Sequence, residues 1–534
     1  MFDGAWTGGK IAGTTLTWTN GTSSTVSIIG NQLVVKMQPP MTAMLQDDGK
    51  LHWGDGDVWE KVCPMRRVLI VGGGLGGMAA ARELRGRFRV TLVDPKEYFE
   101  FTPSIMRAYV DPSHWDSITF LYKEVLERSI GVGFIWGEVT RVDGNTKCAY
   151  VKTIFSKELD VVYFDYCIIA NGCSYSNTDK PNGESPWYPT VQEANPKQMR
   201  DGESEFSHLD ERHLEGRRRR ILEERQSLTE LNNREGTVLI VGAGFRGVQF
   251  ACELEENYPR LSITISDLIP RCCHGMSDAV KDYCEEYIRR RPRIRLALQQ
   301  KYAPKRLNAP NPQYWEAIGL PRGVDKTYFA TNCIQWSYFL PPSVLSTQGA
   351  GSYIATNIHL QVVDAKTERE LFGDGCIFAI GDCIRGRFGE EDDLPQVPKT
   401  GYTAEQQAVV VCQNIVCKDR QLHGSRAVWL CCLPCPGFCA RTNLKRTWYP
   451  WGSDIFAISL GSNDGCVVVG KKESGRILLA GQLAAAAKEL IESTKVAQCK
   501  GDHRISTCIW YLIHHCPVNL TQAKAPCLDL GLIS

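Results

Sequence analysis

The stretch RVLIVGGGLGGMAAARELRGRFRVTLVD (residues 67–94) decides the fold of this 534-residue chain. Residues 68–71 are an unbroken apolar, mostly β-branched run, typical of a strand buried on both faces of a parallel sheet. The glycines that follow have the spacing needed for a tight turn, a close backbone approach to a pyrophosphate and close helix packing: Gly72, Gly74 and Gly77. Asp94 ends a second apolar strand about 20 residues later, where a carboxylate can bind ribose hydroxyls. We therefore predict a complete dinucleotide-binding unit.

A second copy of the pattern, TVLIVGAGFRGVQFACELEENYPRLSITISD, occupies residues 237–267. Its key residues are Gly242, Gly244, Gly247 and Asp267. The acid favours NADH over NADPH, because a carboxylate repels a 2′-phosphate. The nearby Arg246 and Arg271 keep NADPH open as an alternative. One glycine triplet alone can be a structural turn, but two triplets, each flanked by strands and closed by an acid, predict two nucleotide sites.

The third informative element is GCIFAIGDC (residues 375–383), which is typical of flavoproteins. Together with five other segments it makes the chain resemble the two-dinucleotide-binding flavoprotein reductases over roughly residues 66–470. Four segments, VGGGLGG, FDYCIIANG, VGAGFRG and IFAIGDC, identify only this broad superfamily. Two others, PKTGYTAEQQAVVVCQNI (residues 398–415) and ISLGSNDG (residues 458–465), resemble the narrower group of ferroptosis suppressor protein (apoptosis-inducing factor, mitochondria-associated 2) and the type II NADH:quinone oxidoreductases.

The resemblance implies a role for particular residues. FAD would be held by Gly72, Gly74, Gly76, Gly77, Asp94, Ala170, Gly172, Gly381, Asp382 and Lys399, with Asp382 on the ribityl chain and residues 399–403 beside the flavin ring. NADH (or NADPH) would be the co-substrate at Gly242, Gly244, Gly247 and Asp267. Gln406 and Gln407 are candidates for a quinone site, the alternative being that they are polar residues on a helix surface. The chain departs from the family at Asn171, at Asn332 and at Gln249, where many relatives have a glutamate near the nicotinamide.

The expected fold is α/β, with two Rossmann-like dinucleotide-binding domains, the NAD domain inserted in the FAD domain, a small N-terminal all-β module and an α+β C-terminal region. The boundaries expected from composition and motifs are as follows: residues 1–60 for the Trp/Gly-rich β-module, 66–175 and 351–424 for the two parts of the FAD domain, 176–235 for a polar linker and helix, 236–350 for the NAD(P)H domain, and 425–534 for the C-terminal region.

The implied reaction is hydride transfer from NAD(P)H to FAD, followed by electron transfer to an acceptor, for which we favour a quinone. No catalytic side chain is needed, since the flavin carries the chemistry. Alternatives are a reductase serving monodehydroascorbate or an electron-transfer protein, and a redox signalling flavoprotein like apoptosis-inducing factor. The stretch PKEYFEFTPSIMRAYVDP (residues 95–112) has no cysteine, which excludes the Cys-x4-Cys thiol relay of the disulfide reductases.

Charge and cysteine content bound the partners and the compartment. A net charge of +1 and a pI near 7.4 give no reason to expect nucleic acid. The 22 cysteines, without a secretory signal, indicate an intracellular protein, cytoplasmic or peripheral on an organelle membrane and not secreted. Phe2 excludes N-myristoylation. The expected partners are a quinone or another small electron acceptor and a membrane surface, with a homodimer as a further candidate assembly.

Four features have two or more interpretations. We expect no metal, but Cys431, Cys432, Cys435 and Cys439 have spacings compatible with metal binding, lipidation, redox chemistry or an ordinary loop. Residues 477–487 and 505–516 are too short to span a bilayer, so they either lie in the membrane interface, near Lys488, Lys495, Lys500 and Arg504, or pack on the FAD domain.

The arginines at residues 217–220 are either a nucleic-acid patch or, as we favour, a solvated helix with Arg219–Glu223 and Arg220–Glu224 pairs. Trp6, Trp18, Trp53 and Trp59 form either a ligand-binding face or, as we favour, a small core.

Overall fold

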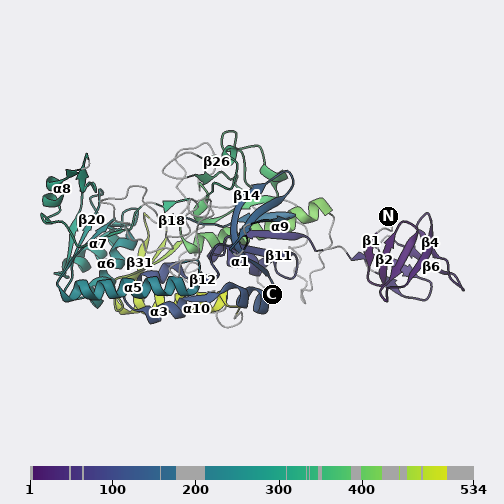
Figure 1. Cartoon of the computed structure of the whole chain (residues 1–534), viewed down its shortest axis with the longest axis horizontal. Helices are drawn as coiled ribbons and strands as arrows, with labels where there is room; N and C mark the ends of the chain where they lie inside the picture. Colours follow the sequence, from purple (N-terminus) through teal and green to yellow (C-terminus); the bar gives the residue numbers. More distant parts are fainter. Residues whose placement is uncertain are drawn as a thin grey trace. The chain divides into compact units, whose positions relative to one another are not determined.

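The structure is a computed structural model, and it forms two compact units, Met1–Arg66 and Arg67–Ser534 (Figure 1). It describes residues 4–501 except for 47–49, 60, 63–64, 155, 157, 176–210, 308, 332, 336, 347–351, 386–398, 424–443, 445–453 and 471–472. Each unit has its own hydrophobic core.

The first unit is one antiparallel nine-stranded sheet in the order β8-β7-β6-β5-β4-β3-β2-β1-β9. Its core contains Trp6, Trp53 and Trp59, which are 3–5% exposed, and Trp18 packs against them. The Trp53 and Trp59 rings lie 4.6 Å apart. Burial of three of the four tryptophans confirms the core interpretation. The strands are β1 (Gly4–Trp6), β2 (Gly9–Ala12), β3 (Thr15–Trp18), β4 (Ser23–Ile29), β5 (Gln32–Val35), β6 (Met41–Leu45), β7 (Leu51–Trp53), β8 (Val58–Trp59) and β9 (Lys61–Val62).

The second unit is built on a seven-stranded sheet in the order β16-β15-β14-β11-β10-β17-β28. The five strands from β14 to β28 are parallel, and β15 and β16 add an antiparallel edge. The first glycine-rich stretch supplies β10, helix α1 and β11, and α1 packs on the long helix α9. The bounds are β10 (Arg67–Val71), α1 (Leu75–Leu84), β11 (Arg89–Asp94), β14 (Gly133–Asp143), β15 (Cys148–Thr153), β16 (Leu159–Tyr163), β17 (Tyr166–Ile169), β28 (Ile377–Ala379) and α9 (Gly401–His423).

A second, four-stranded parallel sheet, β21-β20-β19-β24, comes from residues between β17 and β28 in the chain. The second glycine-rich stretch supplies β19, α6 and β20, so both predicted strand–turn–helix–strand units are present. Farther along the chain, β28 returns to the first sheet. The bounds are β19 (Thr237–Val241), α6 (Phe245–Asn257), β20 (Ser262–Ser266), α7 (Asp278–Arg289), β21 (Ile294–Ala297), α8 (Pro312–Ala317) and β24 (Lys326–Phe329).

Several short elements also belong to this part of the chain. They are β12 (Tyr98–Glu100), a 3₁₀ turn at Thr102–Ser104, α2 (Ile105–Ala108), α3 (Pro112–Ile118), β13 (Thr119–Leu121), a π-helical segment at Glu124–Ile130, β18 (Ser174–Tyr175), β22 (Lys305–Arg306), β23 (Ala309–Pro310), β25 (Cys333–Ile334), β26 (Leu345–Ser346) and β27 (Tyr353–Ile354), with further 3₁₀ turns at Pro342–Val344, Phe372–Gly375 and Gly381–Cys383. β18 pairs with β25, so the two connections between the sheets lie against each other.

Helix α5 (Leu214–Asn233) forms the predicted helix of the polar linker, but the interpretation of residues 217–220 as solvated is wrong for Arg217. Its side chain is fully buried, and its charge is compensated there by ion pairs with Glu100 (2.9 Å) and Glu211 (2.7 Å). The expected partner of Arg220, Glu224, is buried and instead pairs with Lys326 at 2.5 Å. Figure 1 shows α5, α3 and α10 (Gln482–Cys499) running along one side of this unit.

The C-terminal region contains the three-stranded antiparallel sheet β29-β30-β31 and helix α10, which packs on all three strands. The strands are β29 (Asp454–Ser459), β30 (Gly465–Gly470) and β31 (Arg476–Ala480). The apolar segment 477–487 is therefore the end of a strand and the start of a helix. Among the described residues, no helix combines the length and the hydrophobicity that crossing a bilayer requires. The segment 505–516 and Arg504 lie outside the described residues.

Candidate nucleotide and redox site

The first nucleotide loop (residues 72–77) turns sharply between β10 and α1. Gly72 has φ +101°, and a Cβ there would lie 2.5 Å from the Ala170 carbonyl oxygen. A Cβ on Gly77 would lie 1.9 Å from the Gly72 oxygen, so the helix can approach only without a side chain. Gly74 has open space on its Cβ side. These three glycines thus play three different roles, as the spacing predicts.

Asp94 holds the first nucleotide loop in place from the end of β11. Its Oδ2 accepts a hydrogen bond from the Gly73 amide at 2.7 Å, and its Oδ1 accepts one from the Lys96 amide at 2.8 Å. Burial raises the pKa of this carboxyl, although the Lys96 charge and the two amide hydrogen bonds oppose the shift. The Tyr122 hydroxyl donates to the Gly73 carbonyl at 2.7 Å from the other side. Hydrogen bonds within the protein therefore hold this loop in place.

A cavity of about 340 Å³, the main cavity, opens above this loop. Its volume is within the range of small-molecule and cofactor sites. It brings together most of the residues that the sequence associates with FAD: Gly72, Gly74, Gly76, Asp94, Ala170, Gly172, Gly381 and Asp382. They come from three separate stretches of the chain, at the carboxyl ends of β10, β11, β17 and β28. Such an edge of a parallel sheet is where nucleotides bind in this class of fold.

Several residues that line the main cavity belong to no sequence motif, so the sequence could not predict their place in the site. They include Glu100, Tyr122, Glu138, Tyr338 and Phe339. The Glu100 carboxylate accepts hydrogen bonds from the buried Arg217 and from the Trp115 indole (3.1 Å). Burial alone would raise the pKa of Glu100, but the positive charge of Arg217 brings it below the usual value. The main cavity thus has a buried, ionised carboxylate in its wall.

Three predicted residues lie beside the main cavity without lining it. Gly77 is packed under the first nucleotide loop. The Lys399 ammonium donates to the Ile384 carbonyl and lies over the Tyr353 ring. Gln407 is 1% exposed, and its Oε1 accepts a hydrogen bond from the Gly381 amide at 2.6 Å.

Gln406, next to Gln407, is only partly buried and does not line the main cavity either. Their neighbour on α9, Ala404, does line it, together with Thr400 and Gly401. Asn171 also lines the main cavity, whereas Asn332 and Cys431, Cys432, Cys435 and Cys439 lie outside the described residues. Among the described residues, no His, Cys, Asp and Glu side chains form a group suited to a metal ion.

The second nucleotide loop (residues 242–247) repeats the geometry of the first. Gly242 has φ +114°, and a Cβ on Gly247 would lie 1.9 Å from the Gly242 oxygen. Asp267 Oδ2 accepts a hydrogen bond from the Ala243 amide at 2.6 Å. The Arg271 guanidinium binds Asp282 (2.6 Å) and Glu285 (2.9 Å). Of the two cations that kept NADPH open, Arg271 is therefore already held by two carboxylates, while the Arg246 guanidinium lies over the Phe245 ring.

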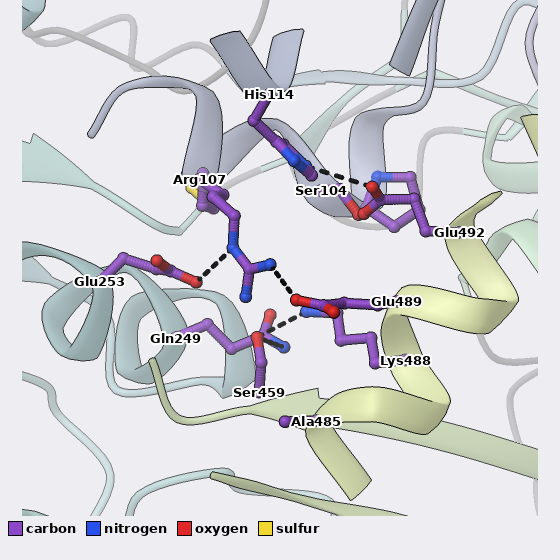
Figure 2. A pocket seen from close by; sticks show the side chains of 12 residues that line it. Ser104, Arg107, His114, Gln249, Glu253, Ser459, Ala485, Lys488, Glu489 and Glu492 are labelled. Carbon is purple, nitrogen blue, oxygen red and sulfur yellow. Dashed lines mark hydrogen bonds and ion pairs between the residues drawn. The ribbon is translucent and has the colours of Figure 1, made fainter. Parts of the chain in front are cut away.

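A second, small cavity of about 20 Å³ lies between α2, α3, α6, β29 and α10 (Figure 2). Arg107 binds Glu253 at 3.4 Å and Glu489 at 2.7 Å, and His114 lies 3.3 Å from Glu492. We call Arg107, His114, Glu253, Lys488, Glu489 and Glu492 the ionic cluster. Pro103 lines this cavity and the main cavity, so the two share a wall.

Gln249, which stands in place of the expected glutamate, faces the ionic cluster (Figure 2). Lys488 Nζ donates to Ser459 Oγ at 2.6 Å. In the amide orientation that satisfies both ends, the Gln249 oxygen accepts from Lys488 Nζ at 3.1 Å and from the Ser459 amide at 2.9 Å. Burial lowers the pKa of Lys488 to about 8 against the opposing attraction of Glu253. Burial raises the pKa of Glu253 despite its ion pair with Arg107.

Comparisons with known proteins agree with this geometry. The sequence profile of the family described as pyridine nucleotide-disulphide oxidoreductase matches residues 66–408. Ferroptosis suppressor protein 1 of Taeniopygia guttata is 25% identical over 420 residues, covering 77% of this chain and 91% of that protein. Apoptosis-inducing factor homolog B of Dictyostelium discoideum is 22% identical over 422 residues, covering 75% and 88%.

Among solved structures, the sulfide:quinone oxidoreductase of Aquifex aeolicus has a TM-score of 0.58 at 18% identity, covering 84% of this chain and 95% of that one. NDH2 of Plasmodium falciparum in complex with NADH has a TM-score of 0.55 at 14% identity, covering 84% and 98%. At these identities the structures show a shared fold.

Proposed function

Because the chain belongs to the pyridine nucleotide-disulphide oxidoreductase family and is an NAD(P)H oxidoreductase, we propose that it passes electrons from NADH through FAD to a quinone at a membrane surface. The observation that carries the proposal is the main cavity, which gathers the glycine loop, Asp94 and the Gly381–Asp382 turn at one sheet edge. Members of this family bind FAD together with NADH or NADPH, as expected for this chain.

The residues present fit FAD. Gly74 leaves open space where a phosphate would approach, and the amide end of α1 faces it. Bound there, FAD supplies the two-electron chemistry of the reaction. The chain's own residues position it: Asp94 and Tyr122 fix the first nucleotide loop, while Gln407 fixes the Gly381 amide of the turn that contributes Asp382. Lys399, which precedes α9, donates to the Ile384 carbonyl just after that turn.

The second nucleotide loop is our proposed NADH site, in the segment between β17 and β28 that we propose as the inserted NAD domain. Asp267 closes it with a carboxylate, and the nearby Arg271 is engaged by Asp282 and Glu285. A 2′-phosphate would therefore meet a negative charge with no unengaged guanidinium at Arg271 to offset it. This arrangement favours NADH over NADPH.

The acceptor proposal rests on relatives and on surface character. Relatives include proteins named ferroptosis suppressor protein 1 and, in Saccharomyces cerevisiae, external NADH-ubiquinone oxidoreductase 2. Leu478 on β31 and Leu483 and Leu490 on α10 are 44–70% exposed, which suits contact with a membrane interface. Of the two glutamines, Gln406 remains the quinone candidate, since Gln407 is buried and already bound to Gly381.

The test is a comparison of acceptors under steady-state conditions. NADH oxidation is measured with a soluble ubiquinone analogue, with ascorbyl radical, and with no acceptor, and is then repeated with NADPH. We expect fast turnover with the quinone alone and a preference for NADH. Turnover only with ascorbyl radical would replace the quinone by another acceptor. Flavin reduction without turnover on any acceptor would favour a signalling flavoprotein.

A further inference from the structure

The ionic cluster lies outside both nucleotide loops, and its small cavity shares Pro103 with the main cavity. We propose that Glu253 and Lys488 form a proton store that feeds the acceptor reaction, with Glu489 as its solvent entrance. The inference rests on the proposed quinone reduction. In that reaction NADH and a quinone become NAD⁺ and a quinol. The hydride supplies two electrons and one proton, so the second proton of the quinol has to come from water.

The ionic cluster spans from solvent to the interior, with Arg107 between Glu253 and Glu489 (Figure 2). The Glu489 side chain is 57% exposed, that of Arg107 is 19% exposed, and that of Glu253 is 4% exposed. One guanidinium binds both carboxylates, so Arg107 positions an exposed and a buried proton acceptor without itself releasing a proton. The cavity of about 20 Å³ between them has room for one water molecule. Protons can therefore move from Glu489 to Glu253 through a single water.

The inner end of the path is the Lys488 ammonium. It contacts the Ser459 hydroxyl at 2.6 Å and, in the favoured amide orientation, the Gln249 oxygen at 3.1 Å. The charged groups that face it are Glu253 on α6, Arg107 on α2 and Glu492 on its own helix. Glu492 is in turn paired with His114 on α3. Beyond this group, Pro103 forms the wall to the main cavity.

The proton affinities of the two storage groups suit this role. Burial lowers the pKa of Lys488 to about 8, and burial raises the pKa of Glu253 above its usual value. Both groups are thereby moved toward the pH at which a proton can be taken up and released in one turnover. Perturbed groups that share a cavity next to a cofactor site are typical of functional sites.

The experiment compares two acceptors on the same full-length holoenzyme. A soluble ubiquinone analogue consumes protons on reduction, whereas ferricyanide accepts electrons alone. The variants are Glu253→Gln, Lys488→Met and Lys488→Arg, and the exposed Lys305→Met is the matched control. We expect each cluster variant to lower quinone turnover by about 100-fold while ferricyanide turnover stays within about twofold of the wild type. The solvent isotope effect on quinone turnover should rise in the variants.

Lys488→Arg separates chemistry from structure. It keeps the positive charge, so it should rescue a purely structural role, but a guanidinium does not release a proton near neutral pH. Rescue of quinone turnover by Lys488→Arg, or an equal loss with both acceptors, would overturn the proton store. A wild type that reduces ferricyanide and no quinone would overturn the proposed acceptor, and with it the need for this proton.

Discussion

Glycines in the first nucleotide loop differ in what a methyl group would meet. Alanine at Gly74 enters open space, whereas alanine at Gly77 would collide with the Gly72 carbonyl. Gly74→Ala should therefore leave the melting temperature of the flavin-free protein unchanged and lower only the bound flavin, because the methyl group occupies the phosphate approach. Gly77→Ala should lower both. Flavin absorbance per protein and thermal unfolding of apoprotein check this, and equal behaviour of the two variants would refute it.

Gln249 contacts the Lys488 ammonium with an uncharged amide, so it adds no charge that would raise the pKa of Lys488. Gln249→Glu places a carboxylate about 3 Å from Lys488 Nζ. An opposite charge at that distance raises the lysine pKa by about 1 unit or more. A raised pKa keeps Lys488 protonated to higher pH, so the fall in quinone turnover near pH 8 should move upward. The pH profile of kcat measures this. An unmoved profile would mean that Lys488 does not set it.

Local sequence patterns predicted many residues of the site. The other residues reach the site only through tertiary packing, which no local pattern reveals. Glycine spacing and the closing acid are encoded within about 30 residues, so both nucleotide loops could be placed from the sequence. Glu100, Tyr122 and Phe339 reach the main cavity only through the fold and belong to no motif. Gln407 matched a motif, but its contact with the Gly381 amide depends on how α9 docks. The ionic cluster joins four helices, and no sequence window contains it.

Helix α5 connects the wall of the main cavity to the second sheet. Arg217 binds Glu100 at one end of the connection, and Glu224 binds Lys326 and the Tyr328 hydroxyl of β24 at the other. The arginine run looks solvated from local sequence because the partner of Arg217 in the cavity wall, Glu100, is supplied by a distant segment. The helix was thus predictable, but its buried face was not.

Arg217→Met should cost about 3–5 kcal/mol of unfolding free energy, since it leaves Glu100 and Glu211 buried without their cation. Arg218, whose side chain is 49% exposed, pairs with an exposed Asp116, so Arg218→Met should cost less than about 1 kcal/mol. Urea denaturation of both variants provides the comparison. Similar midpoints for the two would contradict the role given to Arg217.

The whole molecule consists of a nine-stranded unit with its own tryptophan core and a larger oxidoreductase unit. The family match begins at residue 66, one residue before the second unit begins. A chain that starts at Arg67 should therefore bind FAD and oxidise NADH at the full-length rate. Steady-state kinetics and flavin content test this. A loss of either property would assign the first unit a part in the redox site.

The two proposed nucleotide sites require a bound flavin that NADH reduces. The most direct test is an anaerobic titration of the purified full-length protein with NADH, followed by visible absorption. We predict a yellow protein whose flavin bands disappear after one equivalent of NADH per flavin and return on adding the ubiquinone analogue. A protein that stays colourless after incubation with FAD, or whose flavin bands persist with excess NADH, would contradict the assignment of both nucleotide sites.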